Sequence, residues 1–245
     1  MSEVDTQSSR YWTETTRQQL RWLAAGLVVG FTVPFLFADV LRLPRDLYYG
    51  IYATTVIGFL VLWARSTGQP LDALIRRRWR LAVVLGLVFA LIVAVIVVRT
   101  EPATARPGGL ALAGAVLWRG VVYGAVDGLL LSAFPILVVF AATAGSRLRR
   151  HIVGTAAVGV TALLASLVMT AVYHVGYSEF RSEKLAKPVV GDVVWSLPTL
   201  ATLNPIGASI THAGMHVTAV LHSYQTDTFL PPHRLTTTPT YNNDR

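Results

Sequence analysis

The chain has 245 residues and no cysteine, and 53% of its residues are hydrophobic while only 14% are charged. A soluble domain carries about 25% charged residues, so we expect lipid to cover much of this surface. The missing cysteines exclude disulfides and thiolate chemistry, and leave histidine, carboxylate and carbonyl groups as candidate metal ligands. The net charge of +8 comes from arginines that flank hydrophobic stretches, which indicates contact with anionic lipid headgroups and not with nucleic acid.

Six hydrophobic stretches are long enough to cross a bilayer, which takes about 20 mostly apolar residues in an α-helix. In chain order they cover residues 20–41, 48–64, 81–98, 110–144, 152–173 and 205–224. The first is too long for a signal-peptide core and no small-residue cleavage site follows it, so we expect it to be retained. The fourth is too long for one simple crossing, and we expect its first part, up to about Arg119, to lie at the interface. The sequence therefore predicts an all-α polytopic membrane helix bundle with about six transmembrane helices.

The last stretch has a recognisable beginning. Asn204 is a candidate N-cap, and Pro205 stands at the first helical position, where its missing N–H costs nothing. The apolar segment 196–200 before it is short, and we interpret it as a small re-entrant or interfacial piece. The predicted organisation is a polar cytoplasmic tail over residues 1–19, a six-helix transmembrane domain over 20–224 and a flexible cytoplasmic tail over 225–245.

Arginine and lysine determine the expected orientation, because cytoplasmic loops carry an excess of both residues. With the N-terminus inside, 13 basic residues fall on the inner side, 7 on the outer side and Arg119 within the fourth stretch. The two densest clusters, Arg76 to Arg80 and Arg147 to Arg150, are then both cytoplasmic. The prediction is a plasma-membrane protein with six crossings and both termini in the cytoplasm.

Ionisable residues inside a bilayer are costly, so each of them is a candidate for function. The first three stretches hold almost none, and Asp39 lies near the end of one of them. The fourth, fifth and sixth stretches differ, and they contain Arg119, Tyr123, Asp127, His174, His212, His216 and His222. Of these, His222 lies nearest the expected inner surface and is typical of an interfacial histidine. Tyr173 and Tyr177 are typical of the aromatic belt at a membrane surface.

The spacing of these residues places several of them on shared helical faces. Arg119, Tyr123 and Asp127 are four residues apart, so they lie along one face of the fourth helix. Small residues follow the adjacent face, where another helix could pack closely: Gly120, Gly124 and Gly128. Pro135 is a candidate kink further along the same helix.

His212 and His216 also stand at i and i+4, so their imidazoles can converge on one metal ion. With Pro205 at the outer surface, a rise of about 1.5 Å per residue puts His212 about 10 Å deep and His216 about 16 Å deep. Asp127 lies about 12 Å deep by the same measure, and His174 ends the fifth stretch on the same side. We therefore expect these groups to meet in the outer half of the membrane.

The order of the motifs resembles that of the CAAX-protease and bacteriocin-processing (CPBP) intramembrane proteins. That family carries E-E-x-x-x-R, then an aromatic-x-x-x-H, then H-x-x-x-N/D, on successive helices. Trp118-Arg119-Gly120 is similar to the end of the first motif, His174 to the second and His212-x-x-x-His216 to the third. The resemblance covers residues 110–224.

The chain departs from the family pattern at the positions that handle protons. The paired glutamates would fall at Gly114 and Ala115, the aromatic residue at Thr170, and the last position of the third motif is His216. Asp127, two helical turns beyond the arginine of the first motif, is the remaining intramembrane carboxylate of the region. The resemblance therefore implies a divergent or non-peptidase member.

Three functions fit these residues. The first is a metal-dependent intramembrane hydrolase that binds a divalent metal such as zinc through three ligands, His174, His212 and His216. The candidate catalytic residues are then Asp127 as base or ligand, Arg119 at a developing oxyanion, Tyr123 and His174. Its substrate would be membrane-embedded or enter from the outer face.

The second function is a membrane scaffold, in which the same residues make only interhelical polar contacts. An ion pair between Arg119 and Asp127, bridged by Tyr123, would be one such contact, and the segment Arg76 to Arg80 would hold protein partners. The third is a proton- or metal-coupled transporter, since Asp and His chains also serve proton relays. The sequence shows no internal repeat of the kind many transporters have.

Overall fold

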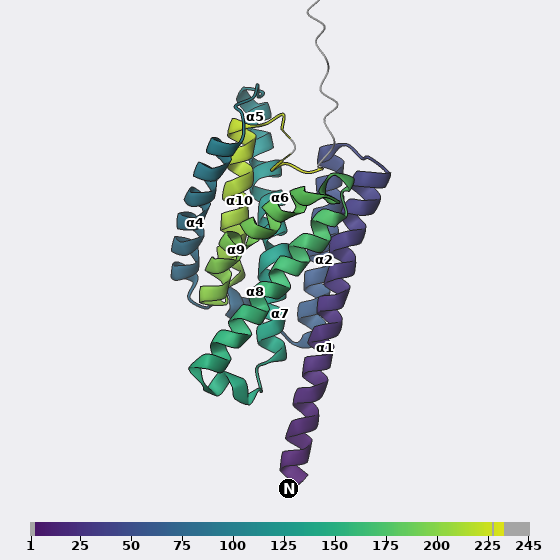
Figure 1. The fold of residues 1–245 in the computed structure, drawn as a ribbon, viewed down its shortest axis with the longest axis vertical. Helices are drawn as coiled ribbons and strands as arrows, with labels where there is room; N and C mark the ends of the chain where they lie inside the picture. The colour runs from purple at the N-terminus through teal and green to yellow at the C-terminus, as the bar shows by residue number, and fades with distance from the viewer. Residues whose placement is uncertain (1–2, 227, 233–245) are drawn as a thin grey trace, which may run out of the picture.

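The computed structural model describes residues 3–226 and 228–232, and the described chain is helical throughout, without strands (Figure 1). Five of its helices are long and apolar enough to cross a membrane: Glu14–Val40, Arg45–Thr67, Trp79–Thr100, Gly109–Ala142 and Ile152–Val175. The predicted class, an all-α polytopic membrane helix bundle, is confirmed.

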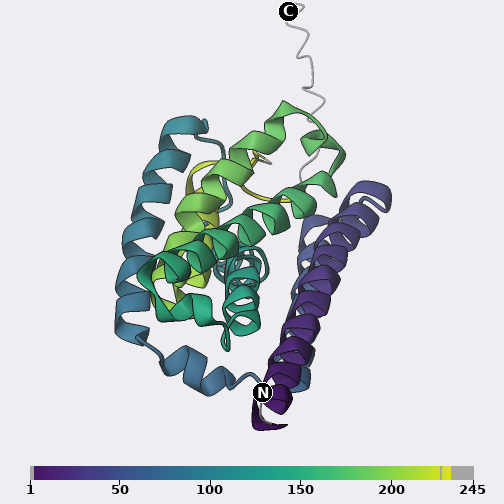
Figure 2. The same cartoon turned by 60° about the horizontal axis from the view of Figure 1, so that its bottom comes forward.

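The first half of the chain forms four helices in sequence. They are α1 (Glu3–Val33) with its π-helical continuation η1 (Pro34–Val40), α2 (Arg45–Thr67), α3 (Leu71–Arg76) and α4 (Trp79–Thr100). Helix α1 therefore begins far before residue 20, the expected start of the first span. Figure 2 shows α3 and its linkers carrying the chain from the α1–α2 pair to α4 on the other side of the bundle.

The second half is built on one long helix. It consists of α5 (Gly109–Ala115), η2 (Val116–Val122), α6 (Tyr123–Gly128), η3 (Leu129–Ala133) and α7 (Phe134–Ala142). After it come η4 (Arg147–Arg150), α8 (Ile152–Val175), η5 (Ser178–Phe180), η6 (Glu183–Leu185), α9 (Ala186–Thr202) and α10 (Pro205–His222).

Contacts between distant segments define the two ends of the bundle. The Asn204 side chain caps α10 by accepting from the Ile206 amide at 2.9 Å, and its own amide donates to the carbonyls of Ile75 and Arg77. Helix α10 therefore begins beside α3, at what we call the α3 end. The other end of α10 lies beside the loop before α5, where His222 Nε2 is 3.0 Å from the Glu101 carbonyl. We call this the α5 end.

Helix α9 is the element that the sequence analysis missed. The segment 196–200, expected to be a short re-entrant piece, is the second half of a 17-residue helix. Its mean hydropathy is lowered by groups that face the protein and not lipid, above all the fully buried Asp192. Because α9 returns the chain to the α3 end, α10 runs opposite to the predicted direction.

This extra helix also overturns the predicted placement of the termini for the described residues. Helix α1 begins at the α3 end, where Thr16 donates to the Ala142 carbonyl at 2.7 Å. Residues 228–232 lie at the α5 end, where Arg45 donates to the Pro231 carbonyl at 3.2 Å (Figure 1). The two ends of the described chain thus lie at opposite ends of the bundle and not on one side. The clusters Arg76 to Arg80 and Arg147 to Arg150 do share the α3 end.

The kink expected at Pro135 takes the form of the π-helical turn η3 directly before it. Proline has no N–H, and its ring displaces the carbonyl four residues earlier, which belongs to Leu131. That carbonyl lies 3.1 Å from the Ser166 hydroxyl of α8. Two π-helical segments, η2 and η3, therefore flank the short α6 that carries Asp127.

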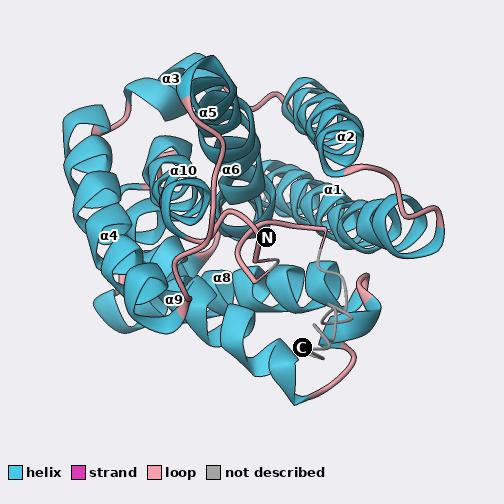
Figure 3. Cartoon of the chain, turned by 90° about the horizontal axis from the view of Figure 1, so that it is seen from above, coloured by secondary structure: helices cyan, strands magenta, loops and turns pink. Residues whose placement is uncertain are grey.

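Helix α10 is enclosed by α4, α6 and α9 (Figure 3). The glycine face predicted for close packing meets α10 directly. A Cβ built at Gly120, Gly124 or Gly128 would lie 2.7 Å from Val217 Cγ2, 2.8 Å from Ala213 Cα and 2.6 Å from the Ala208 carbonyl oxygen, respectively. The two helices therefore run backbone against backbone, and no larger side chain fits between them.

We predict that Gly124→Ala lowers the free energy of unfolding by roughly 1–3 kcal/mol, because the new methyl group must push the α10 backbone away. The matched control is Gly58→Ala in α2, where a Cβ meets nothing within 4 Å. The control is expected to be neutral or slightly stabilising, since alanine is the better helix former. Thermal unfolding of both variants in detergent checks this, and equal melting temperatures would contradict the packing described.

Candidate metal centre

Three buried side chains from two helices meet at one point inside the bundle. Asp127 of α6 is 4% exposed, and His212 and His216 of α10 are 0% and 1% exposed. Asp127 Oδ2 lies 3.3 Å from His212 Nδ1 and 3.5 Å from His216 Nε2. One ligand atom from each residue lies within 4.8 Å of the other two. The glycine contact brings them together, because it sets α6 and α10 side by side with Asp127 over the histidine pair.

The two nitrogen–oxygen separations, 3.3 and 3.5 Å, are close to those expected around a tetrahedral metal ion, and the longer one, from His216 Nε2, also has the geometry of a hydrogen bond. Zinc bonds of about 2.0–2.1 Å at tetrahedral angles put two ligand atoms roughly 3.3–3.4 Å apart. His212 Nδ1 lies 3.3 Å from Asp127 Oδ2, a separation that suits an ion pair as well as two ligands of one metal ion.

Neighbouring aromatic residues hold the three groups in position. Tyr52 of α2 donates its hydroxyl to Asp127 Oδ1 at 2.9 Å, which leaves Oδ2 directed at the histidines. The Tyr123 ring meets the His216 imidazole edge-on, with centroids 5.1 Å apart. Helical spacing predicted Tyr123 on the same face as Asp127, whereas Tyr52 was not predicted, since nothing in the sequence links the second stretch to the fourth.

A second buried carboxylate lies behind His212. Asp192 of α9 accepts from the Ser132 hydroxyl at 2.7 Å and from the Ser166 hydroxyl at 2.5 Å. Ser132 Oγ is also 3.0 Å from His212 Nε2, so Asp192, Ser132 and His212 form a continuous chain. The sequence analysis missed Asp192 and Ser132, although an acidic residue inside an apolar stretch is the signal that could have found Asp192.

Four tyrosine hydroxyls form a buried cluster beside the site. Tyr48 Oη lies 2.5 Å from Tyr177 Oη, and Tyr173 Oη lies 2.7 Å from Tyr177 Oη. Tyr123 Oη joins them at 2.6 Å from Tyr173 Oη. The expectation that Tyr173 and Tyr177 belong to an aromatic belt is wrong, because both are buried beneath α2.

His174 is not part of the Asp127 group in the described structure. Its Nδ1 lies 2.8 Å from the Thr170 carbonyl, one turn earlier in α8. Its ring packs edge-on against Phe180 and Tyr173, with centroids 4.8 and 5.0 Å away. It lies at the α5 end of α8, as expected, but the three-residue ligand group forms without it.

Arg119 also points away from Asp127. Its guanidinium binds both carboxylate oxygens of Asp46, at 2.8 and 2.7 Å, and donates to the Tyr224 hydroxyl at 2.8 Å. The alternative of an Arg119–Asp127 ion pair bridged by Tyr123 is therefore wrong. Arg119 instead ties the long helix to the start of α2 and to the chain after α10.

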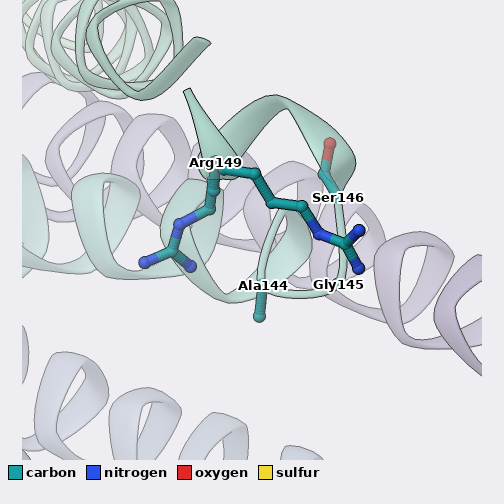
Figure 4. Close-up of a pocket in the computed structure, with 5 residues that line it drawn as sticks. Ala144, Gly145, Ser146 and Arg149 are labelled. Atoms are coloured by element: carbon teal, nitrogen blue, oxygen red, sulfur yellow. The ribbon is translucent and has the colours of Figure 1, made fainter. Parts of the chain in front are cut away.

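The protein also has a surface pocket at the start of α8 (Figure 4). It is lined by Ala144, Gly145, Ser146, Arg149 and Arg150. Residue 144 follows Asp127 by about 25 Å along the long helix. The pocket is therefore not an entrance to the buried residues.

These observations define the chain as a multi-span helical membrane protein with a buried Asp127/His212/His216 cluster. Comparisons with protein-family models, with curated proteins and with solved structures give no match to this chain. The resemblance to the CPBP proteins therefore stays a prediction.

We predict that Arg119→Gln and Asp46→Asn are energetically coupled, by about 1 kcal/mol, because each removes one half of the same partly exposed pair. Arg119→Gln and Asp127→Asn are expected to be additive, since no contact joins them. Double-mutant cycles of unfolding free energy measure both quantities. Coupling to Asp127 in place of Asp46 would contradict the assignment of partners.

Proposed function

We propose that this protein is a metal-dependent intramembrane hydrolase in which Asp127, His212 and His216 bind a divalent metal such as zinc. The observation that carries the proposal is the convergence of these three ligand atoms in the buried interior of the bundle. Nitrogen and carboxylate oxygen are the ligands that zinc takes when cysteine is absent. The cost of burying the Asp127 carboxylate favours a bound cation beside it.

The number of ligands supports a catalytic and not a structural metal. Structural zinc sites have four protein ligands, whereas catalytic sites have three and leave the fourth position to water or substrate. Zinc in such a site lowers the pKa of its bound water to about 7, which supplies a nucleophile at neutral pH. The group among the described residues has three members, two histidines and one carboxylate.

The surrounding side chains hold the ligand residues in position and determine from where a substrate could reach them. Tyr52 fixes the Asp127 carboxylate through Oδ1, and Ser132 fixes the His212 ring through Nε2. Asp127 lies about 12 Å along the helix from Arg119, deeper in the bundle. A substrate would therefore be membrane-embedded, or would enter from the α5 end, and present its hydrolysable bond at this depth.

The alternative, a membrane scaffold, is favoured by one observation. All three ligand residues are almost completely enclosed, which suits a group that only joins α6 to α10. In a scaffold the same residues would serve as interhelical polar contacts. The two functions differ in whether a small molecule can reach the metal.

We predict that the purified protein contains about one zinc ion per chain, and that His212→Ala and His216→Ala each remove it, because two ligands hold it weakly. His222→Ala is the matched control on the same helix, since His222 bonds the Glu101 carbonyl outside the group. His174→Ala is also expected to keep the metal. Elemental analysis measures this, and zinc retained in both His212 and His216 variants would end the proposal.

We predict further that the cobalt-substituted protein changes its visible spectrum when azide or thiocyanate is added, because a catalytic site keeps an exchangeable fourth position. The same titration of His222→Ala, which keeps the ligand group, is the matched control and is expected to respond as the wild type does. A cobalt spectrum that no added anion changes would favour the scaffold, and would contradict the hydrolase even if the metal were bound.

A further inference from the structure

We infer that Asp192 is the positioning and charge-balancing residue of the metal site, and that it acts on His212 through the Ser132 hydroxyl. The inference rests on the proposed metal site and names a residue that does not touch the metal. Asp192 belongs to α9, which supplies no ligand, and Ser132 to the π-helical turn η3 of the long helix that carries Asp127.

The direction of the hydrogen bonds around Ser132 determines which nitrogen of His212 carries the proton. The Ser132 hydroxyl has one proton, which it donates to Asp192 Oδ1 at 2.7 Å. Its oxygen is then free to accept, and the group within reach is His212 Nε2 at 3.0 Å. His212 therefore carries its proton on Nε2, and Nδ1 carries the lone pair.

The lone pair on Nδ1 explains why His212 makes a close contact without a hydrogen bond. Nδ1 lies 3.3 Å from Asp127 Oδ2 and has no hydrogen-bond partner among the described residues. A lone pair facing a carboxylate is unfavourable unless a cation lies between them. A histidine that ligates a metal commonly donates its other N–H to a carboxylate or carbonyl, and here Ser132 passes that bond on to Asp192.

The two buried carboxylates of the site determine the charge of the cation that it would hold. Asp127 and Asp192 are both buried carboxylates, and both accept hydrogen bonds from hydroxyl groups. The arginine of the same long helix, Arg119, is bound to Asp46 and so does not neutralise either of them. With two neutral imidazoles, a divalent cation makes the site neutral, whereas a monovalent cation leaves a buried negative charge.

The test compares zinc affinity in Asp192→Asn, Ser132→Ala and a matched control. Ser196→Ala is the control, because Ser196 contacts Ser166 at 2.7 Å and lies outside the chain from Asp192 to His212. Competition with a chelator is expected to show about 10- to 100-fold weaker zinc binding in both test variants. The control is expected to bind as the wild type does. Ser132→Ala removes a single hydroxyl, so it keeps the test valid if Asp192→Asn fails to fold.

A spectroscopic readout separates positioning from a structural role. Nitrogen-15 chemical shifts of His212 report which ring nitrogen carries the proton, and we expect Nε2–H in the wild type and a mixture in Ser132→Ala. Wild-type protein that binds no zinc would overturn the proposed function itself. Wild-type zinc binding with unchanged affinity and tautomer in both variants would overturn only the role of Asp192.

A separate observation supports a second inference. The pocket at the start of α8 has a volume of about 470 Å³ and is lined by Ser146, Arg149 and Arg150 (Figure 4). Apolar side chains beside it are exposed: Leu148 by 57%, Ile152 by 90% and Val153 by 82%. We infer that this pocket binds the phosphate of an anionic phospholipid, whose acyl chains then cover the exposed apolar residues.

The position and charge of the pocket fit that ligand. Ile152 begins a helix long and apolar enough to cross a membrane, so the residues directly before it lie at headgroup depth. The Arg149 guanidinium is held in place by the Phe140 carbonyl at 3.2 Å and lies over the Phe140 ring. A basic pocket of this kind between apolar surfaces is typical of anionic lipid binding.

Native mass spectrometry with phosphatidylglycerol and phosphatidylcholine tests this inference. The double variant Arg149→Gln/Arg150→Gln is expected to bind phosphatidylglycerol about tenfold more weakly or worse, with little change for phosphatidylcholine. The control Arg76→Gln/Arg77→Gln removes the same charge from the same end of the bundle and is expected to bind as the wild type does. Equal loss in both double variants, or full displacement of the lipid by free inorganic phosphate, would overturn it.

Discussion

The backbone contact between α10 and the glycine face of the long helix is the constraint on which the rest of the structure depends. Three glycines on successive turns let the two helices approach until Cβ atoms no longer fit. Only at this separation does the short Asp127 side chain reach His212 and His216. A wider helix pair would separate the Asp127 carboxylate from both imidazoles inside a low-dielectric interior, which costs free energy.

The remaining helices supply hydrogen-bond partners to the polar groups of α10 and the long helix. Helix α2 supplies Tyr52 to Asp127 and Asp46 to Arg119, while α9 supplies Asp192 behind His212. The early helices are therefore not inert filling, as their apolar sequences suggest. Their outward faces are aliphatic and exposed, as lipid requires.

Local patterns predicted the parts of this protein that depend on one helix at a time. Apolar length gave the membrane class, the N-cap at Asn204 gave the start of α10, and i to i+4 spacing paired His212 with His216. Contacts between different helices could not be predicted from these local patterns. The carboxylate partner of Arg119, Asp46, comes from α2, which is more than 70 residues distant. Helix α9 was missed because the fully buried Asp192 interrupts its apolar sequence. Although α10 runs opposite to the predicted direction, His212 and His216 still lie beside Asp127. Both histidines are near the middle of α10, so reversing the helix changes their depth little.

X-ray absorption at the zinc edge of the zinc-loaded protein tests the central claim most directly. The account predicts only nitrogen and oxygen ligands at about 2.0–2.1 Å, with the multiple-scattering pattern of two imidazoles and a remaining contribution from a carboxylate and a water. The imidazole pattern should fall by half in His216→Ala if any metal remains. A spectrum of six oxygen ligands without imidazole scattering would contradict the site.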